Sequence, residues 1–144
     1  MIRVVLAIAV VGGLAGSSAV FAARHRQDPA APVFTVEQAS SGKAAYARTC
    51  ASCHLPDLSG NNDVPPLAGT AFISNWGPRT TKELFDYMSA TMPPGGSTLE
   101  PDAYLAITAY VLQSNGAGAG SEPYTSSTAV PIASLVPQRG SSGP

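Results

Sequence analysis

The sequence contains few of the residues that bind metals or form covalent bonds with cofactors. Its 144 residues include two cysteines, two histidines, three methionines and one tryptophan. A zinc site needs four ligands, usually with a second Cys or His pair downstream, and the histidine His25 lies far upstream of both cysteines. Zinc is therefore the less supported use of the cysteines. No internal repeat is present, so one binding site in one domain is expected.

Charged residues are also scarce, at 12% of the chain, and the formal net charge is −1. So few charges indicate long uncharged loops rather than helices with charged surfaces. Between Phe34 and Gly116 there are four basic residues and seven acidic ones. This acidic balance makes nucleic acid an unexpected partner.

The two cysteines stand directly before the second histidine, in Cys50-Ala51-Ser52-Cys53-His54. Two thiols three positions apart on a helical turn can each form a thioether with a vinyl group of haem, and the adjacent imidazole then reaches the iron from the same side. C-x-x-C-H is the attachment site of c-type haem, so the motif predicts one covalent haem c (heme c). A dithiol redox pair is the alternative, but it needs a β-α-β surrounding for which the sequence gives no signal.

Residues 1–22 have the pattern of a secretory signal peptide. Arg3 supplies a positive charge, Val4 to Ala15 is apolar, and Val20-Phe21-Ala22 has small residues where cleavage would occur. The alternative is a membrane anchor, because Val4 to Ala23 is about twenty mostly apolar residues. We expect cleavage and a periplasmic protein with no stable membrane span, anchored only if this segment is retained. Export also suits thiols held as thioethers, since free thiols are oxidised in that compartment.

Composition divides the rest of the chain into three parts. Residues 23–36 contain two prolines and are expected to form an extended leader. Residues 37–116 form one globular domain, since a chain of about 122 residues after cleavage supports a single modest core. Residues 117–144 are rich in Gly, Ala, Ser, Thr and Pro and are expected to form an extended tail.

Helix signals occur at three places in the domain. Alanines after Ser40-Ser41 predict a helix over Gly42 to Cys50, capped by a serine. Thr80-Thr81-Lys82-Glu83 is a capping box that begins a second helix. Pro101 begins a last helix, which Ser114-Asn115-Gly116 ends.

Between the first two helices, prolines and glycines interrupt every helical period from Leu55 to Pro78. We therefore expect one long loop there. So long a loop is compatible with a small domain only if a cofactor supplies part of the core. The fold class that follows is all-α, with short helices and long loops around one ligand.

A haem iron needs a second axial ligand, and Met92 is the strongest candidate. It lies 38 residues after His54 and is followed by two prolines and two glycines, which stiffen the segment and let it turn closely. Core packing is the alternative, because a lone methionine most often fills hydrophobic space. Met88 is the competitor, but it follows Leu84 on the apolar face of the predicted helix, so we expect it in the core. His25 lies in the leader and is not expected to bind.

Together these motifs make Glu37 to Gly116 resemble a class I c-type cytochrome, a family of small monohaem electron carriers. Gly42 and Tyr46 match the glycine and the aromatic residue of the family's first helix, where the glycine lets the last helix cross closely. Val64-Pro65-Pro66-Leu67-Ala68-Gly69 resembles the family's Gly-Pro-x-Leu-x-Gly, whose proline carbonyl accepts a hydrogen bond from the haem-binding histidine. The resemblance therefore implies that Pro65 fixes the tautomer of His54.

The resemblance extends to the distal side of the site and implies the small cytochrome c fold. Met92-Pro93-Pro94 is similar to the family's methionine loop, and Tyr104 to Leu112 is similar to its final helix. In related cytochromes a Trp or Tyr before the third helix donates to a haem propionate, which implies that role for Trp76. Core packing is an equal alternative for this side chain. Asn75 and Arg79 are further candidates to offset the propionate charge.

Electron transfer, without a catalytic residue, is the function that the resemblance implies. His/Met ligation keeps the iron six-coordinate, so a change of oxidation state needs little rearrangement, and methionine raises the potential. The implied partners are redox proteins, such as a periplasmic dehydrogenase with a quinone cofactor and a terminal oxidase. In one alternative, a haem enzyme or gas sensor, the methionine is displaced, although the sequence offers no added distal His or Arg. In another, the chain is a permanent subunit of a dehydrogenase or oxidase.

The tail contains one apolar stretch, Ala129 to Pro137, with more aliphatic residues than a solvated linker would have. We expect it to be extended and to dock on a surface, of this protein or of a partner, with Gly116 to Gly120 as a tether. A disordered end without a role is the alternative. Because the predicted haem site is complete before Gly116, the tail is not expected to affect it.

Overall fold

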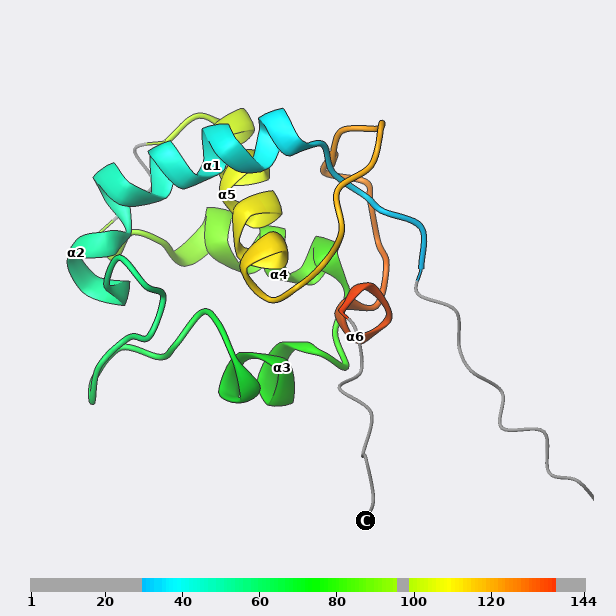
Figure 1. The fold of residues 1–144 in the computed structure, drawn as a ribbon. Coiled ribbons are helices and arrows are strands. Elements are labelled where there is room, and N and C mark those ends of the chain that lie inside the picture. The colour runs from blue at the N-terminus through cyan, green and yellow to red at the C-terminus, as the bar shows by residue number, and fades with distance from the viewer. Residues whose placement is uncertain (1–29, 96–98, 137–144) are drawn as a thin grey trace, which may run out of the picture.

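The computed structural model describes residues 30–95 and 99–136, and within these ranges it contains helices and no strand (Figure 1). The predicted all-α class is confirmed. The signal segment, His25, Gly96 and the last eight residues lie outside the described part. No helix among the described residues is long and apolar enough to cross a membrane. The helices are α1 Val36–Thr49, α2 Ala51–His54, α3 Thr70–Trp76, α4 Thr81–Thr91, α5 Pro101–Ser114 and α6 Ile132–Leu135.

Helix α1 begins before the position that the sequence predicts. The cap is Thr35, whose hydroxyl accepts a hydrogen bond from the Gln38 amide at 3.1 Å. Ser40 and Ser41, the expected caps, lie inside the helix instead. The residue before the cap, Phe34, is fully buried. This buried ring fixes the direction in which the chain enters the helix, and it makes part of the predicted leader a part of the core.

Helices α1 and α5 cross closely at Gly42. A Cβ atom on Gly42 would lie 1.8 Å from the carbonyl oxygen of Ala106, so only glycine allows this approach. Farther along α1, the rings of Tyr46 and Tyr110 pack with their centroids 5.3 Å apart. The crossing holds the end of α1, which leads into the first cysteine, against the longest buried helix of the domain.

The prediction of an uninterrupted loop from Leu55 to Pro78 is wrong for Thr70–Trp76, which form α3. The seven residues between Gly69 and Gly77 contain neither glycine nor proline, so a short helix fits between the two. Phe72 anchors it, with 1% of its surface exposed. A helix of this length is formed mainly by its packing, which is why periodicity alone does not predict it.

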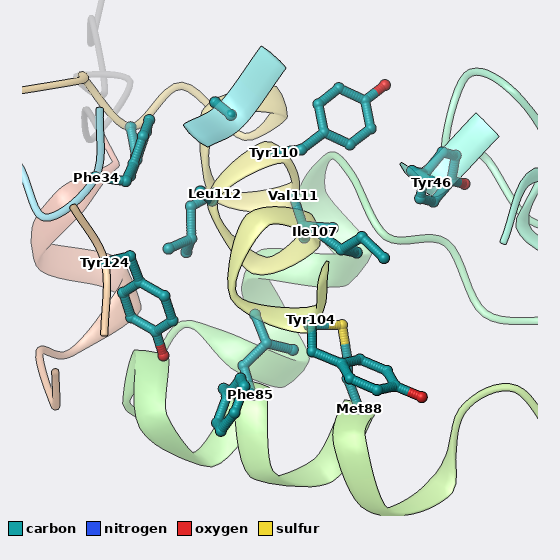
Figure 2. Packing of buried hydrophobic residues seen from close by; sticks show 14 of the residues in the cluster. Phe34, Tyr46, Phe85, Met88, Tyr104, Ile107, Tyr110, Val111, Leu112 and Tyr124 are labelled. Carbon is teal, nitrogen blue, oxygen red and sulfur yellow. The ribbon is translucent and has the colours of Figure 1, made fainter. Parts of the chain in front are cut away.

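Helices α4 and α5 begin where the sequence predicts. In the capping box of α4, the Glu83 amide donates to the Thr80 hydroxyl at 3.2 Å, and the Thr80 amide donates to the Glu83 carboxylate at 2.7 Å. Pro101 occupies the start of α5. Helix α5 is buried along most of its length and forms the centre of the core, with α1 on one side and α4 on the other (Figure 2).

The tail returns to the domain and contributes to the same core. Tyr124, Ile132 and Leu135 are buried, with at most 5% of each exposed. The predicted docking of the apolar stretch is confirmed for residues 129–136, on this protein's own surface. One turn of it, α6, is helical rather than extended. Figure 1 shows the tail crossing from the end of α5 to α6 beside α3.

Candidate functional site

A cavity of about 520 Å³ lies between α2, the following loop, α3, α4 and the start of α5. Its volume is in the range of cofactor sites, roughly 300–1,000 Å³. Most of its lining is apolar. The structure brings all the predicted site residues to this one cavity, namely Cys50, Cys53, His54, Pro65, Trp76 and Met92.

The cysteines and His54 reach the cavity together because they occupy one helical turn. Cys50 ends α1, with its amide donating to the Tyr46 carbonyl at 2.9 Å. It also precedes α2, where the His54 amide donates to the Cys50 carbonyl at 2.9 Å. Cys50 is half-buried and Cys53 is exposed.

The environment of Cys50 does not favour a dithiol redox pair. Burial raises the pKa of the Cys50 thiol, and a contact with the Thr49 hydroxyl only partly opposes this. Reactive redox cysteines instead have lowered pKa values, because the thiolate is the attacking species. The zinc alternative also lacks ligands, since no group of three or more Cys, His, Asp or Glu side chains that could hold a metal occurs in the described part of the chain.

His54 is buried, with 8% of its surface exposed, and its ring is fixed by one hydrogen bond. Its Nδ1 atom lies 3.0 Å from the carbonyl oxygen of Pro65. A carbonyl oxygen can only accept, so Nδ1 carries the hydrogen and donates. In the neutral ring this leaves Nε2 unprotonated and able to bind a metal.

The loop that carries Pro65 is held by its own backbone. The amide of Gly60 donates to the His54 carbonyl at 3.1 Å, and the amide of Leu67 donates to the Leu58 carbonyl at 2.8 Å. Gly60 has φ of +62°, and a Cβ atom there would lie 2.2 Å from the Val64 carbonyl oxygen. Only glycine fits this turn, which sets where the Pro65 carbonyl points.

Met92 lies directly after α4 and also faces the cavity. Its amide donates to the Met88 carbonyl at 2.9 Å, and its carbonyl accepts a hydrogen bond from the Tyr104 hydroxyl on α5. The Met92-Pro93 peptide bond is cis. Sequence analysis missed this hydrogen bond from Tyr104, because it placed Tyr104 only in the final helix.

Met88 lines the cavity as well, but it is a core residue. It is 7% exposed and projects from α4 toward α5 (Figure 2). Met92 is less buried and lies outside the helix, in a segment whose position is set by backbone bonds. The burial of Met88 agrees with the role that its spacing predicts.

Aromatic and polar side chains form another edge of the cavity. Trp76 ends α3, and its ring packs against Tyr87 of α4 with centroids 5.4 Å apart. The Arg79 guanidinium lies 4.8 Å from the centre of the Trp76 ring. Asn75 also lines this edge. Tyr87 is the second feature that sequence analysis missed as part of the site. It is 48% exposed, which is unusual for a large side chain on a helix face that otherwise packs inward.

The residues present fit a haem. An apolar cavity is combined with two thiols and an imidazole on one turn, and with a thioether at the end of another helix. Imidazole and thioether are the axial donors of His/Met haem sites. A guanidinium, an amide and an indole at the rim can donate to carboxylates. No other described part of the chain combines these groups.

Comparison with known proteins gives a family match and similar solved structures. The family model described as cytochrome C oxidase, cbb3-type, subunit III matches residues 37–111. The crystal structure of the sulfane dehydrogenase SoxCD from Paracoccus pantotrophus is similar, with 34% sequence identity and a TM-score of 0.48. The similarity covers 54% of this chain and 43% of that one, so this chain spans less than half of its length. No curated protein matches.

Proposed function

The chain belongs to the family described as cytochrome C oxidase, cbb3-type, subunit III, and is a class I c-type cytochrome; we propose that it carries single electrons through one His/Met-ligated haem c. The observation that carries the proposal is the hydrogen bond from His54 Nδ1 to the Pro65 carbonyl at 3.0 Å, at the wall of a cavity that both cysteines line. This bond leaves Nε2 unprotonated and available to bind the iron.

Six residues that line the cavity have a part in this proposal. Haem c supplies a reversible Fe(III)/Fe(II) couple when bound. Cys50 and Cys53 would hold it by thioether bonds, and His54 and Met92 would bind its iron. The apolar lining excludes water, which with the thioether ligand favours the reduced state. Trp76 and Arg79 offer donors for the propionates.

The proposed setting is the periplasm, with redox proteins as partners. The signal pattern of residues 1–22 supports export. A dehydrogenase with a quinone cofactor is the proposed donor, and a terminal oxidase is the proposed acceptor. The family's description as a subunit of an oxidase supports a terminal oxidase as the electron acceptor. It equally supports a chain that is held permanently by such a complex. The two forms differ in how fast the chain dissociates from its partner.

The cofactor is tested on the protein purified from the periplasm. Acid-acetone extraction should leave the red colour with wild-type protein, because the haem is covalently bound. The double variant Cys50→Ser/Cys53→Ser should lose it to the solvent or bind none. Extractable haem or stoichiometric zinc in the wild type would contradict the proposal.

Carbon monoxide separates the carrier from the gas sensor. A six-coordinate His/Met carrier should bind carbon monoxide poorly in the reduced state, since Met92 occupies the iron. Ready binding by the wild type would favour the sensor or enzyme function. The rate of reoxidation by membranes that contain a terminal oxidase then tests the acceptor, with membranes lacking the oxidase as the control.

A further inference from the structure

The corner between α3 and α4 places a positive charge at the rim of the cavity. Among the described residues that line the cavity, Arg79 is the one with a permanent positive charge. Its guanidinium lies 4.8 Å from the centre of the Trp76 ring, at the end of α3. The position of this charge therefore depends on the backbone of residues 77–81.

The tail pairs with this corner like a short strand. The amide of Ile132 donates to the Arg79 carbonyl at 2.9 Å, and the amide of Ala133 donates to the Gly77 carbonyl at 3.0 Å. The amide of Thr81 in turn donates to the tail, to the Val130 carbonyl at 2.9 Å. Residues 77, 79 and 81 thus all bond to the tail, around a bridge between residues 80 and 131.

Thr81, whose side chain is fully buried, makes several of these hydrogen bonds. Its hydroxyl donates to the Thr128 carbonyl at 2.7 Å and accepts from the Val130 amide at 3.2 Å. Its own carbonyl accepts from the Tyr124 hydroxyl at 2.7 Å. The first residue of α4 is therefore tied to the tail through its amide, carbonyl and side chain.

Tyr124 is itself anchored to α1. The Gln38 side chain donates to the Tyr124 carbonyl at 2.9 Å and accepts from the Tyr124 amide at 2.7 Å. The Tyr124 ring packs against Phe85 of α4 with centroids 6.5 Å apart, and its oxygen points toward α4 (Figure 2). A continuous series of partly or fully buried hydrogen bonds therefore runs from α1 through Tyr124 to Thr81 and the Arg79 corner.

We propose that residues 121–135 act as a strap that fixes the Arg79 corner, with Thr81 and Tyr124 as positioning residues for the positive charge at the cavity rim. The inference rests on the proposed function, because the charge acts on the haem iron and its carboxylates. A nearby cation favours the reduced state, which has one positive charge fewer. Residues 121–135 lie outside the family match, so the strap is a feature of this chain beyond the matched domain.

The test compares variants of the full-length holoprotein. Thr81→Val removes the hydroxyl at nearly constant shape, while Thr81→Ser keeps it, and Tyr124→Phe removes one hydrogen bond from the same network. Ser121→Ala is the control in the exposed part of the tail. Covalent haem content, midpoint potential and hydrogen exchange of the Thr81 and Ile132 amides are measured for each.

Thr81→Val and Tyr124→Phe should lower the midpoint potential and speed exchange of both amides by about tenfold, since the first removes two hydrogen bonds to the tail and the second removes one. Thr81→Ser and Ser121→Ala should stay near the wild type. In an Arg79→Gln background, Thr81→Val should still speed exchange but should no longer lower the potential, because the charge is gone.

Either of two results would contradict the proposed role of the strap. One is an unchanged potential in both variants. The other is a potential drop of the same size in the Arg79→Gln background, which would mean that the tail acts by another route. If Thr81→Val fails to fold, Tyr124→Phe decides alone. A wild type without covalent haem would instead contradict the proposed function.

Discussion

The His54 side of the cavity and the Met92 side are held in different ways. The His54 ring is buried and fixed through its own Nδ1 atom, which donates to the Pro65 carbonyl at 3.0 Å. Within residues 30–95 and 99–136, the hydrogen bonds that hold Met92 involve its main chain: its amide donates to the Met88 carbonyl, and its carbonyl accepts from the Tyr104 hydroxyl. A thioether is a weak hydrogen-bond acceptor, so the Met92 side chain cannot be held by a hydrogen bond as the His54 ring is.

The difference shows which parts of the chain set the position of each proposed iron ligand. The His54 side is one continuous stretch of chain with local backbone hydrogen bonds, so its position depends on the packing of α1, which leads into it, against α5. The Met92 side is assembled from the end of α4, the start of α5 and the adjoining loop, so it depends on packing between elements. Three substitutions test this difference, beginning with the largest expected effect, and a change of pH tests the strap.

Gly42→Ala should destabilise the His54 side by separating α1 from α5. The new Cβ would lie 1.8 Å from the Ala106 carbonyl oxygen, so α1 and its terminal Cys50 must move away from α5. We expect a loss of about 3 kcal/mol of unfolding free energy in urea titration of the holoprotein. Gly118→Ala is the matched control, because nothing lies within 4 Å of its Cβ position. Equal stability of both variants would contradict the close crossing.

Met92→Ala should abolish the distal ligand while leaving the His54 side intact. The iron–thioether absorption band should disappear, the midpoint potential should fall, and the reduced protein should bind carbon monoxide. Met88→Leu should leave these three properties nearly unchanged and cost less than about 1.5 kcal/mol of stability, because it conserves volume in the core. The opposite pattern would identify Met88 as the ligand.

Tyr104→Phe should loosen the Met92 side without removing the ligand. The variant leaves the Met92 carbonyl without the Tyr104 hydroxyl, which should cost about 1 kcal/mol of stability. Because this bond positions only the main chain of Met92, the rate of cyanide binding to the oxidised protein should rise by several-fold. Tyr110→Phe, on the other face of α5, serves as the control for loss of a tyrosine hydroxyl. An unchanged rate would show that the bond does not position Met92.

Alkaline pH should release the strap by deprotonating Tyr124. Burial raises the pKa of Tyr124 to about 12 from about 10 in the unfolded chain. A raised folded-state pKa contributes stability that is complete below pH 10 and is lost as pH rises toward 12. Wild-type stability should therefore fall by roughly 1–2 kcal/mol more than that of Tyr124→Phe over this window. An equal loss of stability in the wild type and in Tyr124→Phe would contradict this role of Tyr124.

Local signals in the sequence predicted much of this structure. The capping box at Thr80 and the proline at 101 are complete within a few residues, so they fix where α4 and α5 begin. The C-x-x-C-H motif likewise brings its three side chains to one turn. The start of α1 and the whole of α3 were missed because buried rings, Phe34 and Phe72, decide them through distant contacts.

The bonds between the tail and the Arg79 corner could not be predicted. They join backbone groups about fifty residues apart in the sequence, and a main-chain donor or acceptor carries no signature of its partner. The apolar composition of residues 129–137 indicated that the tail docks, but not where. Only the fold shows that the tail supports the rim of a site that the sequence completes before Gly116.

The amide of Ala30 donates to the carbonyl of Ser134 at 2.8 Å, so the chain enters and leaves the described structure at one place beside α6. Figure 1 shows α2, which carries Cys53 and His54, on the far side of the molecule. A linker joined near residue 30 or near residue 134 would therefore hold the cytochrome by the same pole. Immobilised on an electrode through either linker, it should face its α2 pole outward, toward a dissolved redox protein.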